Sequence, residues 1–378
     1  MRALSVVGMG FGDCSKGATV DKLCRELPVD TIVRMNGGAQ AAHNVVTPEG
    51  VHHTFSQFGS GMIASQTVKT HLSRFMLVEP MAMMREANKL NEKTSNVWWR
   101  TTVDAKAVIV TPYHRMLNRL RERALGDARH GSCGRGIGVA REMHIKHGDD
   151  VLLAGDTSSV KTLFSKLCFV RDRYWEEIGN HPEYETRIEE FTDISELVYQ
   201  YAHWPATIVD SLEPSECMVF EGAQGVMLDE THGTAPHNTW TDTTFNNADT
   251  LLDEIGVSDR YRIGCLRTYH TRHGAGPFPT ENPHLLSVLP EPHNGVGEFQ
   301  GAFRVGAFDF ELAQKAIEIV GGIDGLSMSH LDCLPALGMP SNFAHQVADT
   351  LDVPLAMTAN GPTATHRTLT MDRKEVNA

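Results

Sequence analysis

The sequence predicts an α/β fold with a mostly parallel central sheet flanked by helices. Apolar runs typical of β-strands alternate with longer helical stretches along the 378 residues, which is the pattern of a parallel sheet covered by helices. The first apolar run leads directly into a glycine-rich turn and then into a helix, an arrangement that binds phosphate. Neither an internal repeat nor a linker interrupts this pattern, so we expect one domain over residues 1–378.

The elements are expected in a definite order. Residues 3–7 form the first strand, the glycine-rich turn follows, and residues 20–27 form a helix. Residues 31–35 form a second strand, and residues 36–43 form a loop that contains glycine. Further strands are expected at residues 107–110, 218–220, 261–266 and 325–328. A mainly helical excursion is expected around residues 157–206, and residues 281–301 are expected to be loop because they are rich in Pro, Gly, Asn and Glu.

Composition limits the classes of partner. The formal net charge is −13, and such an acidic surface repels nucleic acids and anionic membranes while leaving room for a small anionic substrate at a local site. The seven cysteines are odd in number and contain no CxxC pair, which indicates reduced thiols in the cytoplasm. Neither a signal-peptide pattern nor an apolar run of about 20 residues is present, so we expect no membrane association.

The glycine-rich turn has features of a phosphate loop without matching the two commonest motifs. Its glycines let the backbone approach a phosphate, and the following helix offers free N–H groups. GxxxxGK[ST] is absent, and Asp13 stands where GxGxxG requires glycine, which weakens the alternative of an NAD-dependent oxidoreductase. A carboxylate here would repel phosphate unless it binds Mg²⁺ or acts as a base. Capping of the helix is the simpler alternative for Asp13.

Several further motifs follow in order. They are GDCSKGA (12–18), GGAQAAHN (37–44), SCGRGIGVAR (132–141), FEGAQGVMLD (220–229), HGTAP (232–236) with Thr243-Thr244, TRHGAGPFPTE (271–281), SHLD (329–332) and Asn360-Gly361-Pro362. Together they resemble the adenylosuccinate synthetase family, whose corresponding blocks include GDEGKGK, FEGAQGTLLD, TRVGAGPFPTE and TKLD. The EGAQG and GAGPFPTE blocks are specific, and the ordered set extends from residue 8 to about residue 367.

This resemblance implies a fold related to the P-loop NTPases and a defined reaction. The family uses GTP and Mg²⁺ to phosphorylate the 6-oxygen of IMP, and the amine of aspartate then displaces that phosphate. Phosphorylation is needed because a purine 6-oxo group is a poor leaving group. The resemblance also implies a cytoplasmic homodimer, and it leaves ATP or dATP open as the triphosphate.

The resemblance assigns catalytic roles to four residues. Asp13 would be the general base on N1 of the purine and a Mg²⁺ ligand, together with the backbone carbonyl of Ala42. Lys16 would neutralise charge on the transferred phosphoryl group. His43 would be the general acid, and the amide of Gln224 would donate to the 6-oxygen. Simpler alternatives exist for the last three: Lys16 could be a surface lysine, His43 a loop histidine and Gln224 a turn-stabilising amide.

Binding roles follow in the same way. Asp332 would accept from both N1–H and the 2-amino group of guanine, a pair that adenine lacks, which favours GTP. Arg304, with Arg272 as a further candidate, would hold the carboxylates of the amino acid. The substrate phosphate would be held by Gln40, Ser132 or Cys133, and Thr239. The GTP site would comprise Gly12, Ser15, Gly17, Asp332, Gly361 and Pro362.

The chain also departs from the family pattern. Cys14-Ser15 and Ala18 replace Glu-Gly and Lys in the phosphate loop, and the loop that binds aspartate is shortened to residues 298–309. His147 stands where a partner subunit contributes arginine. The short length resembles phage members that convert dGMP, but those carry Ser at the position of Asp13. Open alternatives are therefore IMP or dGMP as substrate, a different amine donor, and a nucleotide-binding regulator that has lost catalysis.

Overall fold

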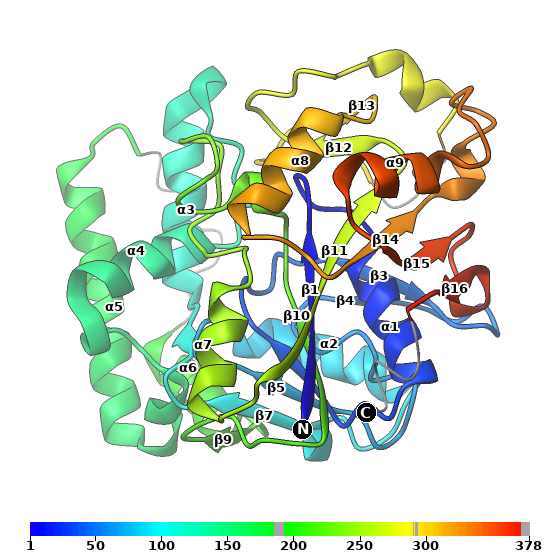
Figure 1. The fold of residues 1–378 in the computed structure, drawn as a ribbon. Coiled ribbons are helices and arrows are strands. Elements are labelled where there is room, and N and C mark those ends of the chain that lie inside the picture. The colour runs from blue at the N-terminus through cyan, green and yellow to red at the C-terminus, as the bar shows by residue number, and fades with distance from the viewer. Residues whose placement is uncertain (185–192, 290, 292–293, 372–378) are drawn as a thin grey trace.

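A mostly parallel sheet forms the centre of the computed structural model, which describes residues 1–184, 193–289, 291 and 294–371 (Figure 1). Its ten described strands lie in the order β16-β15-β14-β11-β1-β10-β2-β5-β7-β9. The first strand of the chain lies in the interior of the sheet, between β10 and β11. All neighbours are parallel except β15 and β16, which are antiparallel at one edge. The predicted α/β class with a mostly parallel sheet is confirmed.

The bounds of the elements are as follows. The strands of the sheet are β1 (Arg2–Gly8), β2 (Thr31–Arg34), β5 (Lys69–Leu72), β7 (Thr101–Asp104), β9 (Thr207–Val209), β10 (Cys217–Glu221), β11 (Asp259–Arg267), β14 (Gly325–Ser329), β15 (Leu355–Ala359) and β16 (Arg367–Leu369). Three two-stranded pairs lie outside it: β3 (His43–Val46) with β4 (His52–Phe55), β6 (Leu77–Val78) with β8 (Val108–Ile109), and β12 (His270–His273) with β13 (Phe303–Gly306). The α-helices are α1 (Lys16–Glu26), α2 (Pro80–Asn91), α3 (Pro112–Leu125), α4 (Ile137–His147), α5 (Val160–Asn180), α6 (Ile194–Ala202), α7 (Asn246–Glu254), α8 (Phe310–Ile319) and α9 (Phe343–Leu351).

Side chains along β1 alternate between two cores, as the pleat of a strand requires. Leu4 and Val6 pack in a core with α1 on one face of the sheet. Ala3 and Val7 pack on the other face, in a core that includes residues of α7, α8 and α9. Because both faces are covered, β1 is apolar on both sides, which is typical of parallel sheets. The glycine-rich turn that follows β1 is thereby fixed at the middle of the sheet.

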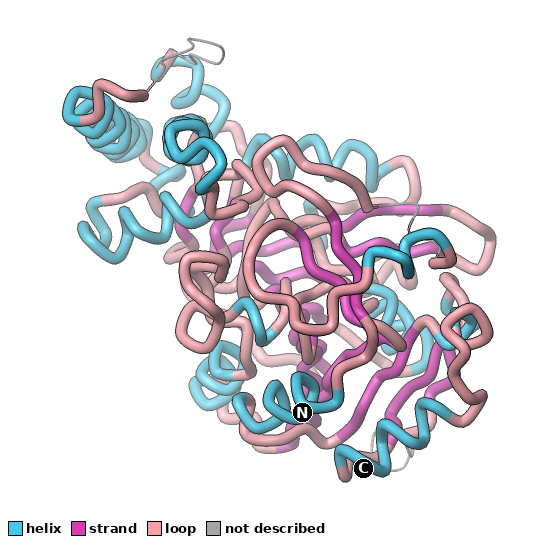
Figure 2. Tube along the Cα trace, turned by 90° about the horizontal axis from the view of Figure 1, so that it is seen from above, coloured by secondary structure: helices cyan, strands magenta, loops and turns pink. Residues whose placement is uncertain are grey.

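The helices α3 to α6 form a group to one side of the sheet, at the left of Figure 1 and the upper left of Figure 2. They share a third core with strands such as β5 and β7. The predicted helical excursion at residues 157–206 contains α5 and α6, while residues 185–192 lie outside the described part of the chain. The sheet takes strands from residue 2 to residue 369, which favours the single domain expected from the sequence.

Some predicted elements differ from the structure. The first helix begins at Lys16 rather than near residue 20, so it starts inside the phosphate loop. The strand predicted at residues 107–110 is β8, which pairs with β6 and is not part of the main sheet. In the main sheet, β5, β7, β9, β15 and β16 were not predicted, because strands of only a few residues give little periodic signal. Within the described residues, no helix is long and apolar enough to cross a membrane.

Candidate active site

A cavity of about 920 Å³ lies at the carboxyl ends of the parallel strands. Its walls come from the loops that follow β1, β2, β10, β14 and β15, together with the segment between α3 and α4. Ligands of open α/β sheets bind at this edge, because the loops there are free to vary while the strands hold them in place. Of the six described non-glycine residues with positive φ, four lie in these loops: Asp13, Ser15, Gln224 and His330. This left-handed backbone costs energy and is concentrated at functional sites.

The loop after β1 shapes the centre of the cavity. Gly12, Asp13 and Ser15 all have positive φ, and α1 begins directly afterwards at Lys16. The free N–H groups of the first turn of α1 therefore face the cavity, as a phosphate requires. The Lys16 side chain is only 4% exposed, and its ammonium group donates to the carbonyl of Gln224 and, at 3.6 Å, to Sγ of Cys14. Lys16 is thus aimed into the site and is not a surface lysine.

Two amide side chains in the cavity wall have buried polar atoms that lack partners. Both side-chain polar atoms of Gln40 and Oε1 of Gln224 have no hydrogen-bond partner among the described residues. Each residue lines the cavity. Buried polar groups without partners are costly, so a ligand that supplies hydrogen bonds would relieve both. For Gln40 this favours the predicted binding role over simple loop polarity. For Gln224 it indicates a ligand donor at Oε1, which leaves the predicted donation by its amide nitrogen a prediction.

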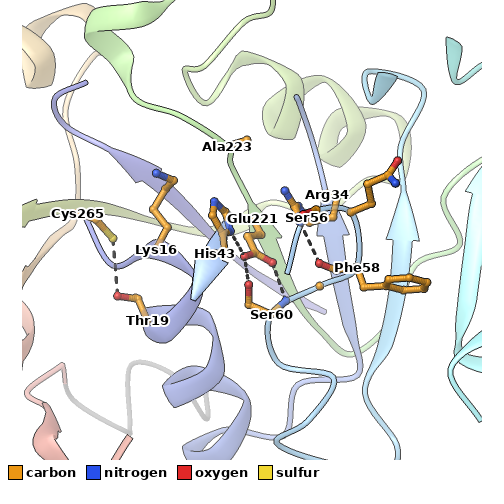
Figure 3. A network of polar contacts seen from close by, with 12 residues as sticks. Lys16, Thr19, Arg34, His43, Ser56, Phe58, Ser60, Glu221, Ala223 and Cys265 are labelled. Atoms are coloured by element: carbon orange, nitrogen blue, oxygen red, sulfur yellow. Dashed lines mark hydrogen bonds and ion pairs between the residues drawn. The ribbon is translucent and has the colours of Figure 1, made fainter. Parts of the chain in front are cut away.

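His43 is held by a buried carboxylate that the sequence analysis did not single out. Nδ1 of His43 lies 2.6 Å from Oε1 of Glu221, at the end of β10, and Glu221 also accepts from the backbone N–H of Ser60 at 2.9 Å and from its hydroxyl (Figure 3). Glu221 is fully buried. Because a carboxylate can only accept, Nδ1 carries the hydrogen, and Nε2 must be protonated before it can donate to a substrate.

Electrostatics keep Glu221 charged and His43 mostly neutral. Burial raises the pKa of Glu221, but Arg34, His43 and Ser60 together outweigh it and lower that pKa to about 2. Burial lowers the pKa of His43 below its ordinary value, although Glu221 opposes this. Arg34 is also fully buried and donates to the carbonyl of Phe58 at 2.9 Å. A phosphoryl group bound beside His43 would supply the negative charge needed to protonate it.

Asp13 forms an ion pair that the sequence motifs did not reveal. Its Oδ2 lies 2.7 Å from Nε2 of His273, the residue that replaces valine in the TRVGAGPFPTE block. Burial alone would raise the pKa of Asp13, but His273, Arg267 and Lys16 lower it to about 2. Arg267 also donates to the backbone carbonyl of Asp13 at 2.9 Å. His273 therefore holds the carboxylate of Asp13 and Arg267 holds its backbone, while the N-cap position of α1 is Ser15 and not Asp13.

The remaining predicted ligand residues lie on the cavity wall. Asp332, Gly361 and Pro362 line it beside β14 and β15. Ser132, Cys133 and Thr239 line it on the side of α3 and α4, and Asn118 donates to the Ser132 hydroxyl at 2.9 Å. Gly12, Ser15 and Gly17 line it in the same loop as Asp13, and Gln40 and Ala42 line it in the loop after β2.

Arg272 and Arg304 do not line the cavity in the structure. Arg272 is 2% exposed, stacks on Phe11 and donates to the carbonyls of Ala275, Pro277 and His237. Arg304 donates to the carboxylate of Glu281 and to two further carbonyls. Because both guanidinium groups are bonded within the protein, their amino-acid-binding role stays a prediction.

The donor set near the phosphate loop fits magnesium. No cluster of three His, Cys, Asp or Glu side chains that could hold a metal ion occurs in the part of the chain that the structure describes. Mg²⁺ does not need one, because it is bound by one or two carboxylates together with substrate phosphates and water. The Asp13 carboxylate and the exposed residue Ala42 both line the cavity, so a carboxylate oxygen and a backbone carbonyl are available there.

A phosphate loop, a fixed carboxylate and a paired histidine at the carboxyl edge of a parallel sheet define a nucleotide-dependent α/β enzyme. The family model described as adenylosuccinate synthetase matches residues 5–339. The chain belongs to the adenylosuccinate synthetase family, the ligases that form a carbon–nitrogen bond at the expense of a nucleoside triphosphate. The family in general depends on Mg²⁺ and GTP.

Relatives and solved structures agree with this assignment. The adenylosuccinate synthetase of Pseudomonas aeruginosa is 32% identical over 342 residues, which cover 88% of this chain and 77% of the relative. That of Histophilus somni is 29% identical over 344 residues, with the same coverage. The fully ligated adenylosuccinate synthetase of Plasmodium falciparum superposes with a TM-score of 0.83 at 19% identity, covering 98% of this chain and 100% of that one. The cyanophage S-2L succinoaminodeoxyadenylate synthetase, bound to dGMP and to dATP as an energy donor, has a TM-score of 0.69 at 19% identity, covering 100% and 97%.

Proposed function

We propose that this protein activates the 6-oxygen of IMP with GTP and Mg²⁺ and replaces it with the amine of aspartate, giving adenylosuccinate. The observation that carries the proposal is the position of Asp13, a charged carboxylate at the phosphate loop in the same cavity as Lys16, His43 and Gln224. A base beside bound phosphates is what phosphorylation of a purine oxygen needs.

The proposed reaction has two chemical steps, phosphorylation of the 6-oxygen and its displacement by an amine. The Asp13 carboxylate accepts the proton of N1, and the resulting charge is delocalised onto the 6-oxygen. That oxygen attacks the γ-phosphorus and GDP leaves, while Lys16 and the N-terminus of α1 stabilise the transferred charge. The neutral amine of aspartate then attacks C6 and loses one proton to water, inorganic phosphate leaves with the 6-oxygen, and protonated His43 hydrogen-bonds the departing group. Asp13 releases the proton taken from N1 to water, which restores the carboxylate. Asp13 and the Ala42 carbonyl would hold Mg²⁺, which would neutralise phosphate charge when bound; because Oδ1 serves N1, the metal would share Oδ2 with His273.

His273 favours a purine without a 2-amino group. A guanine edge presents N1–H and a 2-amino N–H side by side, and a carboxylate pairs with it best through both oxygens. Oδ2 of Asp13 is already bonded to His273 at 2.7 Å, so one oxygen faces the purine. Hypoxanthine, with N1–H alone, fits that arrangement. The phage neighbour binds dGMP, which makes dGMP the second candidate substrate.

The test is direct. The purified protein is incubated with Mg²⁺, GTP and aspartate and with either IMP or dGMP, and the succinyl adduct is measured by mass spectrometry. Adenylosuccinate from IMP is the expected product. An adduct from dGMP alone would reject the preference for IMP, and GTP consumption without an adduct would indicate a different amine donor. Binding of nucleotides without any consumption of GTP, ATP or dATP would support the alternative of a regulator.

The homodimer implied by the family remains part of the proposal. The position at which a partner arginine is expected is His147, the last residue of α4. Sedimentation of the full chain with and without IMP and GTP would measure the oligomeric state.

A further inference from the structure

Arg367 is a buried cation that forms no ion pair with any residue that the structure describes. Its side chain is 4% exposed, and Nε and Nη1 are buried without a hydrogen-bond partner in the ranges that the structure describes. It lines the cavity. Burial lowers the pKa of Arg367 to about 10 despite the attraction of Cys265, Asp21 and Asp332, so the group remains charged at neutral pH. A buried guanidinium without an acceptor is unfavourable, which makes this side chain a candidate for ligand binding.

The fold places Arg367 beside the residues expected to hold the base of the triphosphate. Arg367 is the first residue of β16 and pairs with Ala359, the last residue of β15. Gly361 and Pro362 lie in the loop between these two strands, which is closed by a 3.1 Å hydrogen bond from Asn360 N–H to the carbonyl of His366. Asp332 follows β14, the other neighbour of β15. Three adjacent strand ends therefore bring Asp332, the Gly361-Pro362 turn and Arg367 to one part of the cavity.

The two charged groups complement a guanine ring. A carboxylate accepts from N1–H and the 2-amino group, and a guanidinium donates to O6 and N7, the commonest specific contact that arginine makes with guanine. Adenine offers an amino group where guanine has O6, so it would leave the guanidinium unsatisfied. Lys16 and the first turn of α1 already supply the positive groups that face phosphate, which leaves Arg367 for the base.

We propose that Arg367 is a specificity-determining residue that binds O6 and N7 of the guanine of the triphosphate donor, opposite Asp332. This inference rests on the proposed function, and it explains how the chain would select GTP over ATP. The arginine fork matters as well as its charge, because only a planar group with two parallel N–H donors contacts both acceptors together.

The experiment measures equilibrium binding by calorimetry with Mg²⁺ and without IMP or aspartate. The ligands are GTP and three analogues. The first, 7-deaza-GTP, lacks N7, and the second, 6-thio-GTP, has a weaker acceptor at position 6. The third, ITP, lacks the 2-amino group. The wild-type protein is expected to prefer GTP over the first two analogues by roughly tenfold, the effect of losing one hydrogen bond to a charged group. In Arg367→Met the ratio of the dissociation constants of these two analogues to that of GTP should fall to about one. The preference for GTP over ITP, which we attribute to Asp332, should persist.

Two further variants complete the test. Arg367→Lys keeps the positive charge but lacks the two parallel N–H donors, so it should also lose the preference for GTP over 7-deaza-GTP. This variant tests the inference even if Arg367→Met does not fold. Arg171→Met removes an arginine of α5 that pairs with Asp172 away from the cavity, and it should match wild type. Equal weakening of GTP and all analogues by Arg367→Met would overturn the inference and indicate a phosphate or ribose contact. If Arg367→Met bound all four nucleotides with wild-type affinities, the inference would be overturned and Arg367 would have a structural role only. Failure of the wild-type protein to bind GTP would reject the proposed function itself.

Discussion

Nε2 of His273 lies 2.7 Å from Oδ2 of Asp13, so the protein itself holds one oxygen of the proposed general base. The pair joins two segments that are distant in sequence, the loop after β1 and the end of β12. It fixes which oxygen of Asp13 remains available, and it places a titratable imidazole where the family block has valine.

Asp13→Asn tests the base directly. An amide cannot accept the proton of N1, so turnover should fall by about 10²- to 10⁴-fold. GTP affinity without Mg²⁺ should stay close to the wild-type value, because the phosphates are held by Lys16 and backbone N–H groups. Asp352→Asn is a matched control, because Asp352 also has positive φ but caps α9 away from the cavity. Wild-type turnover in Asp13→Asn, measured by steady-state kinetics, would remove Asp13 from the mechanism.

The pair with Asp13 also predicts how His273 titrates. Burial alone would lower the pKa of His273, but Asp13 raises it above its ordinary value of 6.5. A raised pKa contributes stability that is complete below the unfolded value and is lost as pH rises through the folded value. The difference in unfolding free energy between wild type and His273→Gln should therefore be largest near pH 6 and shrink toward pH 9. Imidazole NMR should show the pKa of His273 falling in Asp13→Asn, and a pKa that does not move would mean that the two groups are not coupled.

Glu221→Gln should be strongly destabilising. Glu221 is buried near His43, Ser60 and Arg34, and removing its charge weakens the electrostatic compensation of the buried Arg34 cation, which costs up to about 3–5 kcal/mol. Ser60→Ala removes one hydrogen-bonding hydroxyl and should cost only about 1 kcal/mol. Urea unfolding measures both. Similar values for the two variants would show that Glu221 is not the centre of this network.

Gly17→Ala should displace His43. A Cβ at Gly17 would lie 2.6 Å from Cβ of His43 and 2.9 Å from Oγ of Ser60, closer than atoms pack. Turnover should drop because His43 moves from its place beside Glu221. Gly179→Ala, in α5 with open space around it, is the control and should be neutral or stabilising by about 0.5–1 kcal/mol. Equal turnover in both variants would argue that the position of His43 is not critical.

The sequence predicted the central part of the site because its motifs lie in loops that end buried strands. Asp13, Lys16, His43 and Gln224 do line one cavity. Once β1, β2 and β10 are recognised as parallel neighbours, their following loops must meet at one edge. Their chemical roles remain predictions until the kinetic tests are made.

Glu221 and His273 were missed for different physical reasons. Glu221 ends the apolar run of β10, and a charged residue that follows such a run needs a buried partner, so this signal was present. His273 could be seen only as one substitution within a motif, and its partner lies 260 positions away. Arg272 matched its motif, yet its guanidinium is bonded to three carbonyls, which no sequence pattern reveals.

The place of β1 in the sheet has a consequence for synthesis on the ribosome. Both neighbours of β1 are made late, since β10 begins at Cys217 and β11 at Asp259. At about 5–20 residues per second, the first strand waits roughly 10–40 s for a partner, with its apolar sides and backbone edges unpaired. His43 waits nearly as long for Glu221, which is 178 positions away. More than half of the chain must therefore leave the ribosome before any nucleotide site exists, and the nascent N-terminal segment depends during that interval on protection from aggregation.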